Sequence, residues 1–65
     1  MMPTVVVDGP PMKSIEQKRT MVQRLTDAAA EVYGYDKMKI SVIIRENPPE
    51  NVGRGGRLIA DLRGE

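Results

Sequence analysis

Blocks of apolar and polar residues alternate along this chain, and each block predicts an element. Residues 4–8 are rich in β-branched side chains and stop at Gly9-Pro10-Pro11, which predicts a short buried strand followed by a break. From residue 15 to residue 33 apolar side chains recur every three or four positions, which predicts an amphipathic helix of about 30 Å. Gly34 is a suitable C′ residue for that helix.

The start of the predicted helix carries a capping signal. Ser14 is a typical N-cap residue, Gln17 stands three positions later as in a capping box, and Glu16 lies near the positive end of the helix dipole. The polar residues expected on the solvent side are Lys18, Arg19, Gln23, Arg24, Asp27 and Glu31.

Residues 39–45 alternate with period two and predict a second strand. One face carries Ile40, Val42 and Ile44, and the other carries Ser41, Ile43 and Arg45. A strand, a long helix and a second strand predict a parallel pair with a right-handed crossover. One helix cannot cover both apolar faces of this sheet, so we expect the second face to pack on another subunit.

A glycine-rich segment follows the second strand. Residues 53–57 read Gly-Arg-Gly-Gly-Arg and predict a turn or small hairpin, which could add a strand to a neighbouring subunit. The same segment also resembles an RNA-binding arginine-glycine stretch or a phosphate-binding nest. A single copy without aromatic residues, in a chain of formal net charge +1, favours the structural turn.

Size and composition limit the remaining possibilities. The chain has 65 residues, which predicts one domain spanning residues 1–65, and a monomer this short buries too little surface, so self-association is expected. Without histidine or cysteine there is no disulfide framework and no conventional zinc site, and we expect no metal or cofactor. The balanced charge and short apolar runs give no indication of nucleic acid, a membrane span or a signal peptide, so a cytoplasmic protein is expected.

Pro3 is the candidate catalytic residue. Within a chain its imide nitrogen carries no proton, whereas as the first residue it is a secondary amine. The pKa of a free α-amino group lies at about 7.7 to 8.0, and an apolar, cation-lined pocket would lower it, which suits a general base near neutral pH. Met1 and Met2 precede Pro3, so this chemistry requires their removal, or translation from Met2 followed by its removal.

Taken together, these features resemble the 4-oxalocrotonate tautomerase family. The resemblance rests on Pro3, Glu16-Gln17-Lys18, the strand at residues 40–45 with Glu46 after it, and Gly53-x-Gly55-Gly56, and it runs without a gap from Pro3 to about Leu58. It implies an α+β fold: a β-α-β unit with a parallel strand pair, one long helix and a C-terminal glycine-rich turn or hairpin, completed by oligomerisation. It also implies a homohexamer, built as a trimer of dimers, whose active sites each combine residues of more than one subunit; a hetero-oligomer is the alternative.

The resemblance also implies site residues and a reaction. In the family the N-terminal proline moves a proton between oxygen and carbon of an unsaturated 2-oxo acid, and arginines hold the carboxylates. The family's first arginine corresponds to Lys13, its strand arginine to Ser41 and its pocket aromatic to Val52. Lysine keeps the charge but not the bidentate fork of arginine. The basic residues proposed to hold a small carboxylate substrate are Lys13, Arg45, Arg54 and Arg57.

Two functions are therefore carried forward. The first is a tautomerase-type isomerase with Pro3 as proton shuttle. The alternative is a non-catalytic structural or partner subunit of a tautomerase-like oligomer, with the base blocked by the retained methionines. Hydration or dehalogenation of an unsaturated acid is a third reading, for which no water-activating carboxylate can be assigned.

Overall fold

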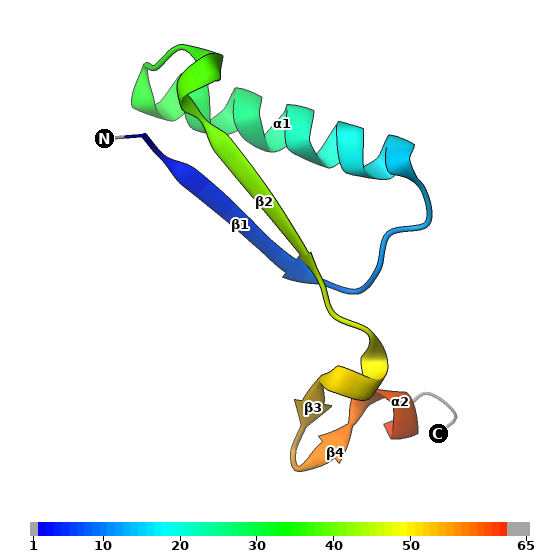
Figure 1. The fold of residues 1–65 in the computed structure, drawn as a ribbon. Helices are drawn as coiled ribbons and strands as arrows, with labels where there is room; N and C mark the ends of the chain where they lie inside the picture. The colour runs from blue at the N-terminus through cyan, green and yellow to red at the C-terminus, as the bar shows by residue number, and fades with distance from the viewer. Residues whose placement is uncertain (1, 63–65) are drawn as a thin grey trace.

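The computed structural model describes residues 2–62 and confirms the β-α-β unit with a C-terminal hairpin (Figure 1). No helix within that range is both long and apolar enough to cross a membrane. The elements in chain order are β1 (Thr4–Gly9), α1 (Ile15–Tyr33), the 3-10 helix η1 (Lys37–Lys39), β2 (Ser41–Glu46), the 3-10 helix η2 (Pro49–Asn51), β3 (Gly53–Arg54), β4 (Arg57–Leu58) and α2 (Ile59–Leu62).

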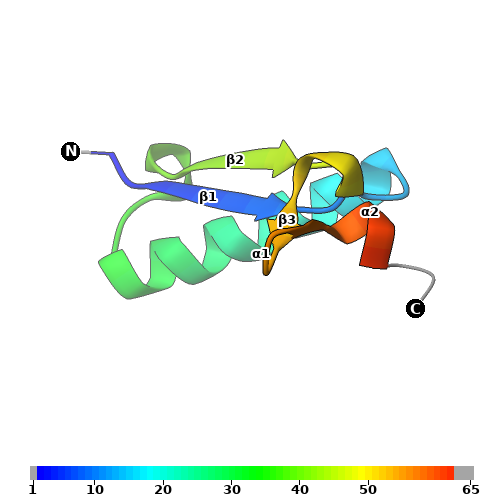
Figure 2. The same cartoon turned by 90° about the horizontal axis from the view of Figure 1, so that it is seen from below.

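The parallel pair of β1 and β2 is covered on one face only. Its register places Val6 beside Ile43 and Asp8 beside Arg45. The alternate side chains along both strands are half-buried on the side where α1 lies (Figure 2). On the open side, Val6 and Ile43 remain 43% and 46% exposed. The strand predicted at residues 4–8 is present, but within a single chain it is half-buried on one face and exposed on the other.

Helix α1 is capped at both ends as its sequence predicts. Ser14 accepts a hydrogen bond at Oγ from the Gln17 N–H at 3.2 Å, and Gly34 takes the left-handed conformation with φ 72° while its N–H donates to the Ala30 carbonyl. Lys18 differs from the prediction, because it is half-buried and its ammonium reaches the end of β2 instead of open solvent.

The glycine-rich segment forms the predicted hairpin. Gly55 and Gly56 have φ values of 60° and 83° and connect β3 to β4, in keeping with the two-residue turns that need positive φ at both positions. The Ile59 N–H donates to the Val52 carbonyl at 2.7 Å and ties α2 to the start of the hairpin. The hairpin and α2, which together form the C-terminal unit, lie beyond the C-terminal ends of β1 and β2, away from the N-terminus (Figure 1).

One chain of this shape leaves a large surface uncovered. Its accessible surface is 5258 Å², roughly 1,100 Å² more than a compact monomer of this mass exposes. The radius of gyration is 15.2 Å, against about 11 Å for a compact chain of this length. Only two apolar side chains, Ala30 and Ile40, are buried among the described residues. The fold therefore presents apolar surface suited to packing against further chains.

Gly34 offers a direct test of the helix C-terminus. Alanine at this left-handed position costs about 1 kcal/mol even though its Cβ would meet open space. We expect Gly34→Ala to lower the thermal unfolding midpoint by several degrees at a fixed protein concentration. Gly9→Ala is the matched control, because its Cβ also meets open space and its φ is not left-handed. Equal destabilisation by both substitutions would contradict this account.

Candidate active site

Pro3 lies directly before β1, at the end of the sheet where the chain begins. Its carbonyl accepts a hydrogen bond from the Ser41 N–H at 3.0 Å, so the Pro3 backbone is held by β2. Met2 lies outside the strand and is 60% exposed. The position of Pro3 therefore depends on β2 and not on packing of the residue that precedes it.

Lys13 belongs to the loop between β1 and α1. Its backbone N–H donates to Oε1 of Gln17 at 2.8 Å, so the Gln17 side chain bonds the residue before the N-cap and not the Ser14 N–H of a standard capping box. The Lys13 ammonium is exposed and forms no ion pair with any residue between 2 and 62. This positive charge is therefore free to meet a ligand.

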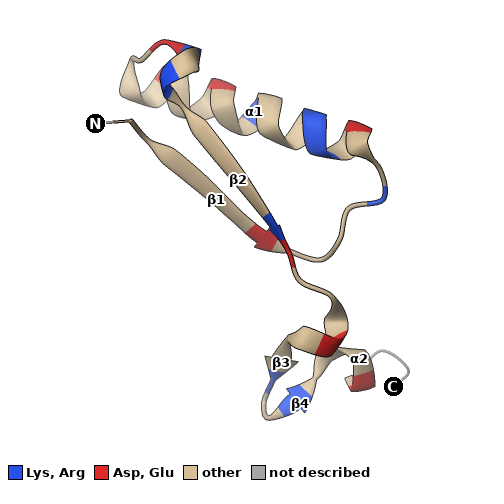
Figure 3. Cartoon of the chain, viewed as in Figure 1, with Lys and Arg blue, Asp and Glu red and all other residues tan. Residues whose placement is uncertain are grey.

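The three arginine candidates lie near the C-terminal ends of β1 and β2 or in the hairpin beyond. Arg45 is on the open face of the sheet, where Nη1 is 4.0 Å from Oδ2 of Asp8. Both side chains are more than half exposed, so this pair is weak and leaves the guanidinium able to exchange partners. Arg54 and Arg57 stand opposite each other across the hairpin. Figure 3 shows that this part of the chain carries both basic and acidic positions.

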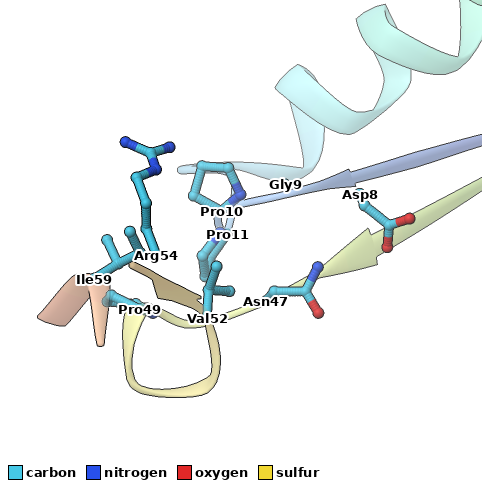
Figure 4. Close-up of a pocket in the computed structure, with 9 residues that line it drawn as sticks. All are labelled: Asp8, Gly9, Pro10, Pro11, Asn47, Pro49, Val52, Arg54 and Ile59. Atoms are coloured by element: carbon cyan, nitrogen blue, oxygen red, sulfur yellow. The ribbon is translucent and has the colours of Figure 1, made fainter. Parts of the chain in front are cut away.

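A cleft of about 530 Å³ opens between the end of β1 and the C-terminal unit (Figure 4). Its walls are mainly rigid or apolar side chains, with a few polar groups at the edge. The lining residues are Asp8, Gly9, Pro10, Pro11, Asn47, Pro49, Val52, Arg54 and Ile59. Mostly apolar clefts with few charged groups are typical of small-molecule sites.

The cleft was not anticipated from the sequence, although two of its members were named. Arg54 was a predicted carboxylate ligand and Val52 a predicted pocket residue, and both line the cleft. The proline pair at residues 10–11 was predicted only to end the first strand, but both of its prolines, and Pro49 from the pair at residues 48–49, form walls of the cleft. Two proline doublets following the two strands of a parallel pair were the available signal, because such ends meet at one edge of the sheet.

Glu46 is a further polar residue at this edge that sequence reasoning assigned no role. Its Oε1 is 2.7 Å from Nζ of Lys18, and its Oε2 accepts the Met12 N–H at 2.7 Å. The hydrogen bond from Lys18, and then that from the Met12 N–H, hold the pKa of the Glu46 carboxyl below its usual value. Glu46 therefore stays ionised and links β2, α1 and the loop that carries Lys13.

Within one chain the candidate residues do not form a single site. Pro3 and Gly9 lie at opposite ends of β1, which at about 3.3 Å per residue separates them by about 20 Å. Arg45 lies near the far end of the strand pair, and Lys13 follows Met12, which is bonded to Glu46 at that end. Arg54 and Arg57 lie in the hairpin, and Arg54 lines the cleft. A pocket that contains both the Pro3 nitrogen and the cleft thus requires a second copy of the chain.

Comparison with known proteins places this architecture in a family. The chain matches the family described as tautomerase enzyme over residues 3–62. It is 38% identical over 60 residues to a probable tautomerase of Halalkalibacterium halodurans, covering 92% of this chain and 98% of the relative. It is 33% identical over 61 residues to the 2-hydroxymuconate tautomerase of Bacillus subtilis, covering 94% and 98%.

Solved structures agree with the sequence comparison. The crystal structure of DmpI from Archaeoglobus fulgidus superposes with a TM-score of 0.82 at 51% identity, over 91% of this chain and all of the other. TomN, a 4-oxalocrotonate tautomerase homologue in the tomaymycin biosynthetic pathway, superposes with a TM-score of 0.89 at 32% identity, over 97% of both chains. On these matches, which span nearly the whole chain in sequence and in structure, the protein belongs to the tautomerase family.

Proposed function

We propose that this chain is a tautomerase that moves a proton within a small unsaturated 2-oxo acid, using Pro3 as the first residue of the mature protein. The observation that carries the proposal is the family match, which begins at Pro3 and continues through the cleft residues. The proline is also held at the start of β1 by the hydrogen bond from Ser41.

The proposed reaction needs no group besides the chain's own residues. The secondary amine of Pro3 takes the proton from the enol oxygen and returns it to carbon, so the product is an isomer of the substrate and the amine is regenerated. Lys13, Arg45, Arg54 and Arg57 are proposed to hold the substrate carboxylate and to stabilise the negative charge of the dienolate. Arg54 has the strongest support among them, because it lines the cleft.

We further propose that residues 1–65 act as one domain and assemble as a hexamer, a trimer of dimers. Three observations support assembly: the open face of the β1-β2 pair, the extended shape of the chain and the separation of Pro3 from the cleft. In such an assembly the Pro3 nitrogen of one chain would reach the cleft of another.

The alternative function, a non-catalytic subunit that contributes only its fold, is favoured by one specific observation. Ser41 lies beside the Pro3 carbonyl, and Val52 lines the cleft, where the family pattern has an arginine and an aromatic residue. The chain thus keeps the architecture of the family but lacks the arginine and the aromatic residue that the family pattern has at these two positions.

Turnover separates these two functions. Protein verified by intact mass to begin at Pro3 should ketonise phenylenolpyruvate or 2-hydroxymuconate faster than buffer alone. Absence of turnover with both acids, in a sample whose secondary structure and oligomeric state are intact, would reject the isomerase and favour the structural subunit.

A further inference from the structure

Two hydrogen bonds from backbone N–H groups to side chains fix the loop that carries Lys13, one at Met12 and one at Lys13 itself. The Lys13 N–H donates to Oε1 of Gln17 at 2.8 Å, inside the cap of α1. The Met12 N–H donates to Oε2 of Glu46 at 2.7 Å, across 34 positions of sequence. The second bond is the one that connects the loop to β2, and therefore to the sheet edge that borders the cleft.

The Glu46 carboxylate is itself held in place. Nζ of Lys18 contacts its other oxygen at 2.7 Å, and the two side chains are only 36% and 28% exposed, for Lys18 and Glu46 respectively. The ion pair between Glu16 and Arg19, by contrast, lies within one turn of α1 and is mostly exposed. The Lys18–Glu46 pair is thus the less exposed of the two. Glu46 joins three separate segments of the chain, which are β2, α1 and the loop that carries Lys13.

We propose that Glu46 is a positioning residue, which acts through the Met12 N–H to place the Lys13 ammonium for a substrate carboxylate; this inference rests on the proposed function. Without the carboxylate, the Met12 N–H would turn to water and the loop would adopt further conformations. Lys13 would then meet the carboxylate less often in the correct geometry. Because a carboxylate is charged in both substrate and transition state, the loss should fall mainly on binding and less on kcat.

The test uses protein that begins at Pro3 and a carboxylate that cannot tautomerise, 3-phenylpropionate, as the binding probe. Glu46→Ala should raise the dissociation constant of the probe about tenfold, the size expected for one charge-assisted contact. Glu46→Gln should recover most of that affinity, because its amide oxygen still accepts the Met12 N–H. Glu31→Gln is the matched control, on an exposed part of α1 with no ion pair to any described residue, and should leave the constant unchanged.

Lys13→Gln distinguishes positioning from general damage to the fold. If Glu46 acts through Lys13, then Glu46→Ala should have no further effect on probe binding in the Lys13→Gln background. All titrations are made below the unfolding midpoint of each variant, and Glu46→Leu, whose side chain has a similar size but accepts no hydrogen bond, replaces Glu46→Ala if the latter does not fold. Three results would overturn the proposal. The first is a dissociation constant within twofold of the parent's for a Glu46 variant in which a loss is expected. The others are an additive loss of affinity in the double variant and no measurable binding of the probe by the parent.

Turnover of phenylenolpyruvate by the same samples keeps this inference separate from the proposed function. A parent that binds the probe in the expected pattern but shows no turnover would reject proton transfer by Pro3 and leave the role of Glu46 standing. Turnover by the parent together with unchanged binding in the Glu46 variants would reject the positioning role alone.

Discussion

Protein that retains Met1 and Met2 is expected to have about 100-fold to 10,000-fold less tautomerase activity than protein that begins at Pro3, the range that a general base contributes. The physical reason is that the peptide bond to Met2 converts the secondary amine of Pro3 into a tertiary amide, whose lone pair is delocalised into the carbonyl and does not accept a proton. Met2 lies outside β1 and is 60% exposed, so its presence should leave the fold unchanged. The measurement is kcat/KM for phenylenolpyruvate on two samples whose first residue is verified by mass.

Pro3→Ala, also with a free amino terminus, tests whether any N-terminal amine is sufficient or whether the proline ring is needed. A primary amine remains at the same site but lacks the pyrrolidine ring, so we expect activity between the two forms above. Thermal unfolding and oligomeric state should be the same in all three samples. Equal activity with and without the two methionines would contradict the proline mechanism.

The second large effect is expected at the open face of the sheet. Ile43 is 46% exposed in one chain and would be buried in the proposed assembly. Ile43→Asp should therefore dissociate the assembly at micromolar concentration and abolish turnover, because it removes apolar contact area and places an unpaired carboxylate in the interface. Symmetry repeats the change on both sides of an interface, so a loss of about 4 kcal/mol, or about 1,000-fold in association, is expected. Analytical ultracentrifugation and the turnover assay on the same sample measure both consequences.

Val32→Asp is the matched control for this prediction. Val32 is 86% exposed on α1, away from the strand face, and receives the same kind of charge. It should sediment as the parent does and keep its activity. Dissociation by both substitutions, or by neither, would show that the open face of β1 and β2 is not the surface that joins the subunits.

The repeating pattern of the chain predicted the elements well, because their signals are local. The alternation at residues 39–45, the N-cap at Ser14 and the glycine at 34 each depend on neighbours within four positions, and the structure confirms all three. The observed strand β2 begins slightly later than predicted, at Ser41, because residues 37–39 form a 3-10 turn capped by Asp36.

The candidate site was less predictable, because it depends on contacts between distant residues. The Glu46–Met12 bond spans 34 positions, and no local pattern couples them. Lys18 occupied a position that periodicity assigned to solvent, but the end of β2 supplies it with a carboxylate. The role of Pro3 was predicted from the chemistry of an N-terminal secondary amine and from the family resemblance. Its separation from the cleft became visible only when the direction of β1 and the place of the hairpin were known.

That separation has a consequence for mixed populations of this protein. In the proposed assembly each chain serves two different pockets, one with the nitrogen at the start of β1 and another with the walls at the end of β1. A chain defective in only one of these roles still performs the other for its neighbour. Two defective alleles in one cell could therefore complement each other, and some pockets would contain two sound halves although no single polypeptide is intact.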